Sequence, residues 1–183
     1  MLKYILLGFL NYQPMSGYDL KSLMDESTSH FWHAYHSQIY TTLRKLEEDG
    51  LLVSEEIEAE DAKLNRRVYS ITAAGQAELR DWLAQTMSEP TPVKEDLLVR
   101  LFFSGSRDRE STLNELRLQR QFHQQKLALY NSLSPHHLVA DMDATPELLR
   151  EARFWATTLE FGKRYEHMYL AWLEDTIRTI EAF

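Results

Sequence analysis

Cysteine is absent from this sequence of 183 residues, which excludes disulfide scaffolds, zinc fingers, thiol catalysis and iron–sulfur clusters. Positive charge is scarce, because 20 Lys and Arg residues face 28 Asp and Glu residues, for a formal net charge of −8 at pH 7. That acidity argues against a protein that coats nucleic acids or membrane surfaces indiscriminately. Long apolar runs are also missing. No segment approaches the roughly 20 apolar residues of a membrane span, and the stretch after Met1 is too short for a signal peptide, so we expect a cytoplasmic protein.

The chain has enough apolar residues for a packed core, since 44% are hydrophobic and 11% aromatic, which excludes a disordered protein. Pro90 and Pro92 mark where it divides. Each proline lacks a donor N–H and restricts the residue before it, so no helix continues through this segment. We therefore expect a first domain over residues 1–90 and a second over residues 91–183.

Three helices are expected early in the first domain. A compact apolar helix comes first and ends at residues 11–14. Ser16 and Asp19 have the spacing of a capping box, which predicts that a second helix begins there. A third helix is expected from Ser37 to Gly50, where glycine supplies the left-handed residue that follows a helix end.

Two strands and a fourth helix complete the first domain. Residues 51–57 and 67–71 alternate or carry β-branched side chains, as strands do. Thr72 is then the expected N-cap of the fourth helix. The residues that this helix is expected to bury are Ala77, Leu79, Trp82 and Leu83. Three helices followed by a two-stranded hairpin predict a winged helix-turn-helix.

The second domain is predicted to be all-helical, and its last helix, roughly residues 147–183, has two apolar stripes about 100° apart. One stripe is Leu148, Ala152, Trp155, Leu159, Gly162, Glu166, Tyr169, Leu173, Thr176 and Ile180. The other is Phe154, Thr158, Phe161, Tyr165, Met168 and Trp172. Because two or three helices cannot cover both stripes, a second copy of the chain is the expected cover, and we expect a homodimer. The residues expected at the dimer interface are Trp155, Leu159, Phe161, Tyr165, Met168, Tyr169, Trp172 and Leu173.

The third helix is the candidate DNA-recognition helix. Residues 27–43 contain no Asp, Glu, Lys or Arg, although the protein is acidic. The side chains at helical spacing that must face the core are Ile39, Leu43 and Leu46. The opposite face then presents Ser37, Gln38, Thr41 and Lys45, with Tyr40 and Arg44 at its margins. Such side chains suit base edges and phosphates, and a recognition helix contacts the major groove through its N-terminal residues.

The hairpin adds three basic residues, Lys63, Arg66 and Arg67, that are placed to contact DNA beside the recognition helix. The charge balance opposes this interpretation, because residues 1–90 hold 8 basic and 14 acidic side chains. We therefore expect weak nonspecific affinity for DNA and few true binding sites.

Several motifs occur in one order: SGYDL at 16–20, Phe31-Trp32, HSQIYTTL at 36–43, LEEDGL at 46–51 and RVYSITAAG at 67–75. Together they resemble the PadR family of bacterial transcriptional regulators, and the helical second half resembles its larger members. The resemblance implies a dimer held by C-terminal helices, a pseudo-palindromic operator and often a small effector. The DNA contacts it implies are Ser37, Gln38, Tyr40 and Thr41 in the recognition helix, Tyr18 near the backbone, and Arg66 and Arg67 in the wing. The wing tip, residues 61–65, departs from the family in lacking glycine and proline.

Catalytic and metal chemistry have weaker support. His30, His33 and His36 recur every three residues, but no carboxylate accompanies them, and the resemblance places them at the entry to the recognition helix. The sequence has no Gly-rich phosphate loop and no nucleophile elbow. We expect neither an enzyme nor a metal site, and no cofactor.

The aromatic second half fits a dimer core or a pocket for a small aromatic ligand, and periodicity does not separate the two. The candidate effector-binding residues are Phe154, Trp155, Tyr165, His167 and Tyr169. We expect a DNA-binding transcriptional regulator, more readily a repressor than an activator, with double-stranded operator DNA as its partner. The alternative from another class is a winged-helix module that binds a protein partner and not DNA.

Overall fold

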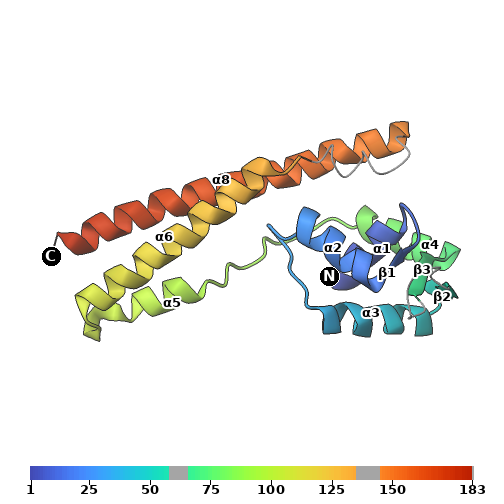
Figure 1. Ribbon diagram of the computed structural model, residues 1–183, viewed down its shortest axis with the longest axis horizontal. Helices are drawn as coiled ribbons and strands as arrows, with labels where there is room; N and C mark the ends of the chain where they lie inside the picture. The colour runs from blue at the N-terminus through green and yellow to red at the C-terminus, as the bar shows by residue number, and fades with distance from the viewer. Residues whose placement is uncertain (58–65, 135–144, 183) are drawn as a thin grey trace. The chain divides into compact units, whose positions relative to one another are not determined.

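The computed structural model describes residues 1–57, 66–134 and 145–182, which form two compact units, Met1–Pro90 and Thr91–Phe183. Figure 1 labels the elements of both. The first unit contains, in order, α1 (Leu2–Leu10), β1 (Met15–Ser16), α2 (Gly17–Ser27), α3 (His36–Glu48), β2 (Leu52–Ile57), β3 (Arg66–Ile71) and α4 (Ala73–Ala84).

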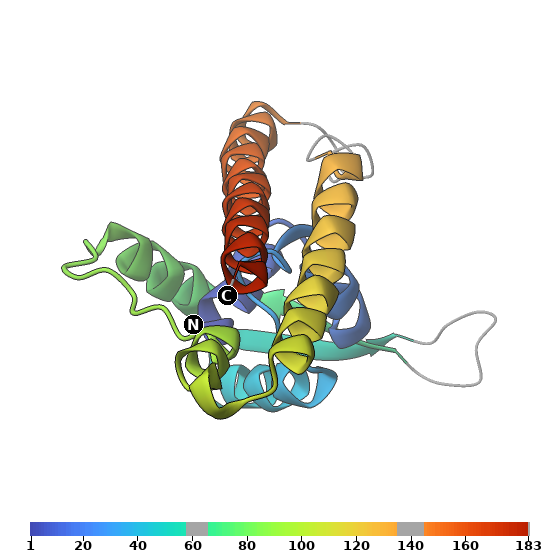
Figure 2. The same cartoon turned by 90° about the vertical axis from the view of Figure 1, so that its left-hand side faces the viewer.

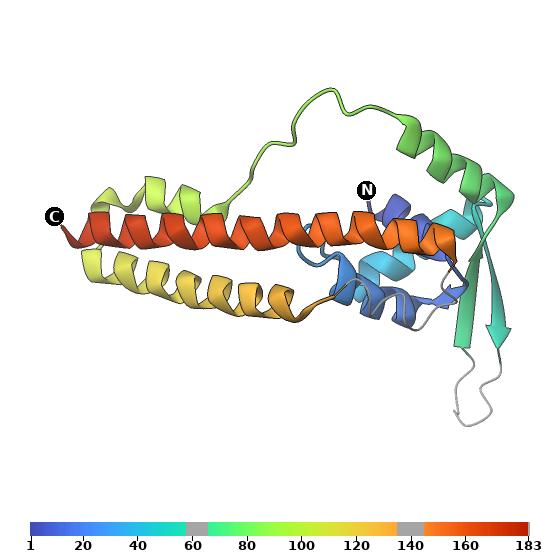
Figure 3. The same cartoon turned by 90° about the horizontal axis from the view of Figure 1, so that it is seen from above.

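The sheet of the first unit has three antiparallel strands in the order β1-β3-β2. Ser54 of β2 pairs with Tyr69 of β3, and Met15 of β1 pairs with Tyr69 from the other side. The ribbon of β2 and β3 is seen best in Figure 3. The sequence predicted β2 and β3 but not β1, because a strand of two residues has no alternation to detect.

The predicted helix caps are present. The Ser16 hydroxyl accepts a hydrogen bond from the Asp19 N–H at 3.2 Å, and an Asp19 carboxylate oxygen accepts one from the Ser16 N–H at 3.0 Å. Gly50 follows α3 with a φ of 70°, a conformation that side-chain-bearing residues rarely adopt. The Thr72 hydroxyl caps α4 by accepting from the Gly75 N–H at 3.1 Å.

The core of the first unit joins α1, α2, α3 and the sheet. Its fully buried side chains include Leu6, Leu7, Leu20, Met24, Ile39, Leu43, Leu46 and Leu52. On α4, Leu79 is buried and Trp82 stacks on Tyr4 of α1, with ring centroids 4.4 Å apart. The prediction that Leu83 is buried is wrong, since it is 66% exposed. It follows Trp82 directly and so points about 100° away from the side chain that stacks on α1.

The second unit is built on two long helices, α6 (Arg109–Ser132) and α8 (Pro146–Glu181), preceded by α5 (Asp96–Phe102) and a short 3-10 turn, η1 (Ser104–Ser106). Figures 1 and 2 show α6 and α8 side by side. They run antiparallel, because Arg109 at the start of α6 donates to backbone carbonyls at the end of α8. No helix within the described ranges is long and apolar enough to span a membrane.

The two stripes of α8 have different environments in the single chain. The first is largely buried, including Leu148, Ala152, Leu159, Tyr169 and Leu173. In the second, by contrast, Phe154, Phe161 and Met168 are more than half exposed. The first, inward stripe therefore packs within the chain, and it includes the predicted interface residues Leu159, Tyr169 and Leu173. In the second, outward stripe, Phe154, Phe161 and Met168 face solvent, while Tyr165 and Trp172 pack partly against the core of this unit.

Candidate nucleic-acid interface

The two faces of α3 differ as the periodicity predicts. Ile39, Leu43 and Leu46 are buried against α1 and α2, which fixes the orientation of the helix. The side chains predicted to contact DNA from α3 are all exposed: Ser37, Gln38, Tyr40, Thr41, Arg44 and Lys45. One face of α3 therefore exposes hydrogen-bonding side chains from its first turn to beyond its middle.

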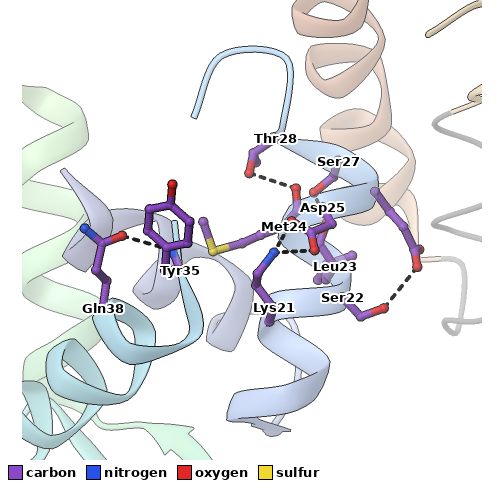
Figure 4. A network of polar contacts seen from close by, with 10 residues as sticks. Lys21, Ser22, Leu23, Met24, Asp25, Ser27, Thr28, Tyr35 and Gln38 are labelled. Atoms are coloured by element: carbon purple, nitrogen blue, oxygen red, sulfur yellow. Dashed lines mark hydrogen bonds and ion pairs between the residues drawn. The ribbon is translucent and has the colours of Figure 1, made fainter. Parts of the chain in front are cut away.

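Gln38 has a second role at the start of α3. Its side-chain oxygen accepts a hydrogen bond from the Tyr35 N–H at 2.9 Å, as Figure 4 shows. This bond satisfies one of the backbone donors that a helix start leaves without an intrahelical partner. A carboxamide oxygen has two lone pairs, so the bond orients the Gln38 side chain and still leaves acceptor capacity for a base.

The N-terminal part of α3 borders a shallow hollow of about 360 Å³. Leu2 of α1 contributes to it beside Ser37, Gln38, Thr41 and Thr42. The Thr42 hydroxyl donates to the Gln38 carbonyl oxygen at 2.7 Å and is occupied within the helix. Ser37, Gln38 and Thr41 are therefore the side chains of this hollow that are placed to bind an outside partner.

Tyr40 is positioned by close packing on α2. A Cβ atom at Gly17 would lie 2.5 Å from Cε1 of the Tyr40 ring, so only glycine permits this approach. Tyr40 remains 45% exposed, and the neighbouring Tyr18 is exposed as well. The structure thus places Tyr18 and Tyr40, both predicted to contact DNA, where the first turn of α2 packs against α3.

The two wing arginines at the start of β3 pair with carboxylates of other elements. Arg66 forms an ion pair with Asp19 of the α2 capping box. Arg67 pairs with Glu47 of α3 at 2.7 Å. Neither pairing is visible in the sequence, because the partners lie 47 and 20 residues apart along the chain. Lys63 and the wing tip lie outside the described residues.

These pairs set the protonation of the two carboxylates. Burial raises the pKa of Asp19, but the hydrogen bonds from Ser16 and Arg66 outweigh it and hold that pKa below its ordinary value. The pKa of Glu47 is lowered chiefly by the hydrogen bond from Ser54 and then by Arg67. Both carboxylates are therefore charged at neutral pH and offset part of the positive charge of the wing.

The candidate effector residues lie on three faces of α8 and do not converge. Trp155 and Tyr169 belong to the inward stripe, Phe154 and Tyr165 to the second stripe, and His167 is exposed on a third face. Among them, the Tyr165 and Tyr169 rings approach each other, with centroids 5.7 Å apart. Burial raises the pKa of Tyr169 far above its ordinary value, so it is a neutral hydroxyl.

A buried polar pair in the second unit was not predicted. His123 of α6 is 8% exposed and Glu166 of α8 is 2% exposed, and the imidazole Nδ1 contacts the carboxylate directly. The His123 ring also stacks on Tyr169, with centroids 3.9 Å apart. The available signal was Glu166 itself, a charged residue within the inward stripe. In the chain as described, no three His, Asp or Glu residues form a group that could hold a metal ion.

Three helices, the third with an exposed polar face, followed by a wing of two antiparallel strands, define the winged helix-turn-helix class of transcriptional regulators. Residues 6–81 match the Transcriptional regulator PadR-like family, and residues 93–181 match the family described as Virulence activator alpha C-term. The Negative transcriptional regulator PadR of Bacillus subtilis is 30% identical over 99% of this chain and 98% of its own. The chain belongs to the PadR-like family of transcriptional regulators, which are not enzymes.

Solved structures agree with this assignment. Bacillus subtilis PadR in complex with operator DNA is similar with a TM-score of 0.79 at 30% identity, covering 98% of this chain and 97% of that one. Its complex with p-coumaric acid gives 0.68 at 27% identity, covering 98% and 95%. The Vibrio cholerae virulence activator AphA gives 0.71 at 25% identity, covering 100% and 99%. The predicted fold, a winged helix-turn-helix followed by helices, is confirmed.

Proposed function

We propose that this protein binds a pseudo-palindromic DNA operator as a homodimer and represses transcription from it. The observation that carries the proposal is the exposed polar face of α3, in a chain 30% identical to a negative regulator known in complex with operator DNA. The unit of residues 1–90 is then the DNA-binding domain, and the unit of residues 91–183 is the dimerisation domain.

The proposed DNA contacts follow from side-chain chemistry. Gln38 suits the hydrogen-bonding edge of adenine, while Ser37 and Thr41 suit bases or phosphates. Arg44 and Lys45 extend the same face with positive charge, which favours contact with the backbone. The wing arginines and the tyrosines at the junction of α2 and α3 lie in the same unit and add further backbone contacts.

Dimerisation is proposed through the outward stripe of α8. Phe154, Phe161 and Met168 expose apolar surface that a second copy of the chain would remove from water. Tyr165 and Trp172 are half-buried members of the same stripe and would complete the contact. A two-fold dimer also sets the separation of the two α3 helices, which a palindromic operator requires to be about one helical turn or a multiple of it, some 34–36 Å each.

We also propose that a small aromatic effector regulates operator binding. It is supported by the complex of Bacillus subtilis PadR with p-coumaric acid and, among the candidate residues of α8, by Tyr165 and Tyr169, whose ring centroids lie 5.7 Å apart. A ligand that prefers one arrangement of the dimer over another would change operator occupancy through that difference in affinity. Titration of phenolic acids into the protein–operator complex tests this part by release of the DNA.

The contact residues are tested by the double variant Gln38→Ala with Thr41→Ala, assayed by fluorescence anisotropy on operator fragments and by sedimentation velocity. We expect operator affinity to fall at least tenfold while the dimer persists, because two hydrogen-bonding side chains are removed from α3 and none from α8. The matched control is Gln85→Ala, an exposed glutamine after α4, which should bind as the wild type does.

One observation favours a second candidate function. Residues 1–90 carry 8 basic and 14 acidic side chains, which fits a winged helix that binds a protein partner. Unchanged DNA affinity in the double variant, or no operator binding by the wild type, would favour that candidate. The similarity to AphA supports activation of transcription in place of repression. Reporter expression in cells with and without the protein distinguishes activation from repression.

A further inference from the structure

Arg67 is held on three sides in the first unit. Its Nε–H donates to the Ser54 hydroxyl at 2.8 Å, and an Nη2–H donates to the Glu47 carboxylate at 2.7 Å. Its guanidinium carbon lies 5.6 Å from the centroid of the Tyr69 ring. Arg67 and Tyr69 are two residues apart on β3 and therefore share one face of the sheet.

Glu47 is itself fixed by a second contact. The Ser54 hydroxyl donates to its other carboxylate oxygen at 2.5 Å, and the Glu47 side chain is only 28% exposed. Glu47, Ser54 and Arg67 thus form a closed ring of hydrogen bonds that joins α3, β2 and β3. Each of the three side chains is held by the other two.

The ring leaves Arg67 able to bind an anion. A guanidinium has five N–H donors, and the two bonds described use two of them. The Arg67 side chain is 52% exposed, so an anion from outside can reach it. An arginine already fixed in one orientation loses less rotamer freedom when it binds a phosphate than a mobile one does.

We propose that Glu47 is the residue that positions Arg67 for the contact with the DNA backbone that the proposed function gives to the wing. This inference rests on the proposed operator binding and adds to it the residue that holds Arg67 in place. It assigns to an acidic residue at the end of α3 a favourable effect on DNA affinity, whereas a carboxylate near DNA ordinarily repels the phosphates. Removal of Glu47 should therefore lower DNA affinity, whereas removal of an ordinary carboxylate near DNA should raise it, and an affinity measurement distinguishes the two.

The test compares four variants of the full-length protein with the wild type, by anisotropy on one operator fragment. They are Glu47→Ala, Glu48→Ala, Arg67→Ala and the double variant Glu47→Ala with Arg67→Ala. Glu48 is the matched control, an exposed glutamate one residue further along α3. Thermal unfolding of each variant identifies any loss of affinity that comes from unfolding.

We expect Arg67→Ala to weaken operator binding by about tenfold or more, the scale of a lost hydrogen bond to a charged group. Glu47→Ala should weaken it severalfold, and Glu48→Ala should leave it unchanged or slightly tighter. In the Arg67→Ala background, Glu47→Ala should weaken binding no further, because there is no guanidinium left to position. A Glu47→Ala variant that binds as tightly as Glu48→Ala, or that loses the same factor with and without Arg67, overturns the proposal.

A second measurement does not depend on DNA. The Nη2–H of Arg67 donates to the Glu47 carboxylate, so its resonance, assigned by its loss in Arg67→Ala, should exchange slowly with water in the wild type and quickly in Glu47→Ala. Equal exchange in both proteins contradicts the positioning role. If the wild-type protein binds no operator, both the proposed function and the DNA contact of Arg67 are overturned. If exchange is nevertheless slow in the wild type and fast in Glu47→Ala, Glu47 holds Arg67 in place but has no role in DNA binding.

Discussion

Replacing His123 with leucine removes the partner of the buried Glu166 carboxylate between α6 and α8. Glu166 is 2% exposed, so water does not replace the lost partner, and the histidine also loses its stack on Tyr169. Removal of one member of a buried pair typically costs about 3–5 kcal/mol, a large part of the 5–15 kcal/mol that stabilises a typical domain. We expect His123→Leu to lower the free energy of unfolding of the second unit by at least about 3 kcal/mol.

The assay is urea unfolding of the full chain, followed by tryptophan fluorescence and by hydrogen exchange of α6 and α8. The double variant His123→Leu with Glu166→Leu should recover most of the loss, since both polar groups are then replaced by apolar ones of similar volume. His167→Ala is the control, because His167 is exposed on another face of α8 and should change stability by less than about 0.5 kcal/mol. A loss below about 1 kcal/mol in His123→Leu, or a double variant less stable than the single one, refutes the reasoning.

Three further predictions concern the first unit. Gly75→Ala places a Cβ 2.3 Å from the Leu51 carbonyl oxygen, a backbone atom that cannot move aside easily, and should destabilise this unit by about 2 kcal/mol or more in thermal unfolding. Gly17→Ala displaces only the exposed ring of Tyr40, so operator affinity in anisotropy should fall while stability changes by less than about 1 kcal/mol. The pKa of Asp19 lies below its ordinary value of 3.8, so its stabilising contribution is complete above that pH and disappears as the pH falls through the folded-state pKa. Melting temperatures between pH 6 and pH 2.5 should therefore converge for the wild type and Asp19→Asn at the acid end, and a constant difference would contradict this.

The sequence predicted the elements whose signals are local. The capping box of Ser16 and Asp19, the glycine after α3 and the buried positions of α3 each depend on residues within one or two turns of one another. The inward stripe of α8 was recovered for the same reason, since periodicity along one helix defines its face. The prediction that Leu83 is buried was wrong, because periodicity does not show how wide a face of α4 the rest of the unit covers.

What the sequence could not predict are contacts between distant segments. Arg66 and Arg67 were identified as basic residues of the wing, but their pairing with Asp19 and Glu47 depends on how β3 lies against α2 and α3. His123 and Glu166 are 43 residues apart and meet only because α6 and α8 run antiparallel in one register. Pairs of this kind are invisible to motif and spacing, although they determine which charges the interface presents.

Operator selectivity of the wild-type protein tests the central claim most directly. Fragments enriched from a genomic pool are compared with random duplex of the same length by anisotropy at two salt concentrations. The account predicts that enriched fragments bind at least about a thousandfold more tightly than random duplex, and that both affinities fall as salt rises, because phosphate contacts release counterions. Equal affinity for enriched and random DNA, or no binding at either salt concentration, would contradict it.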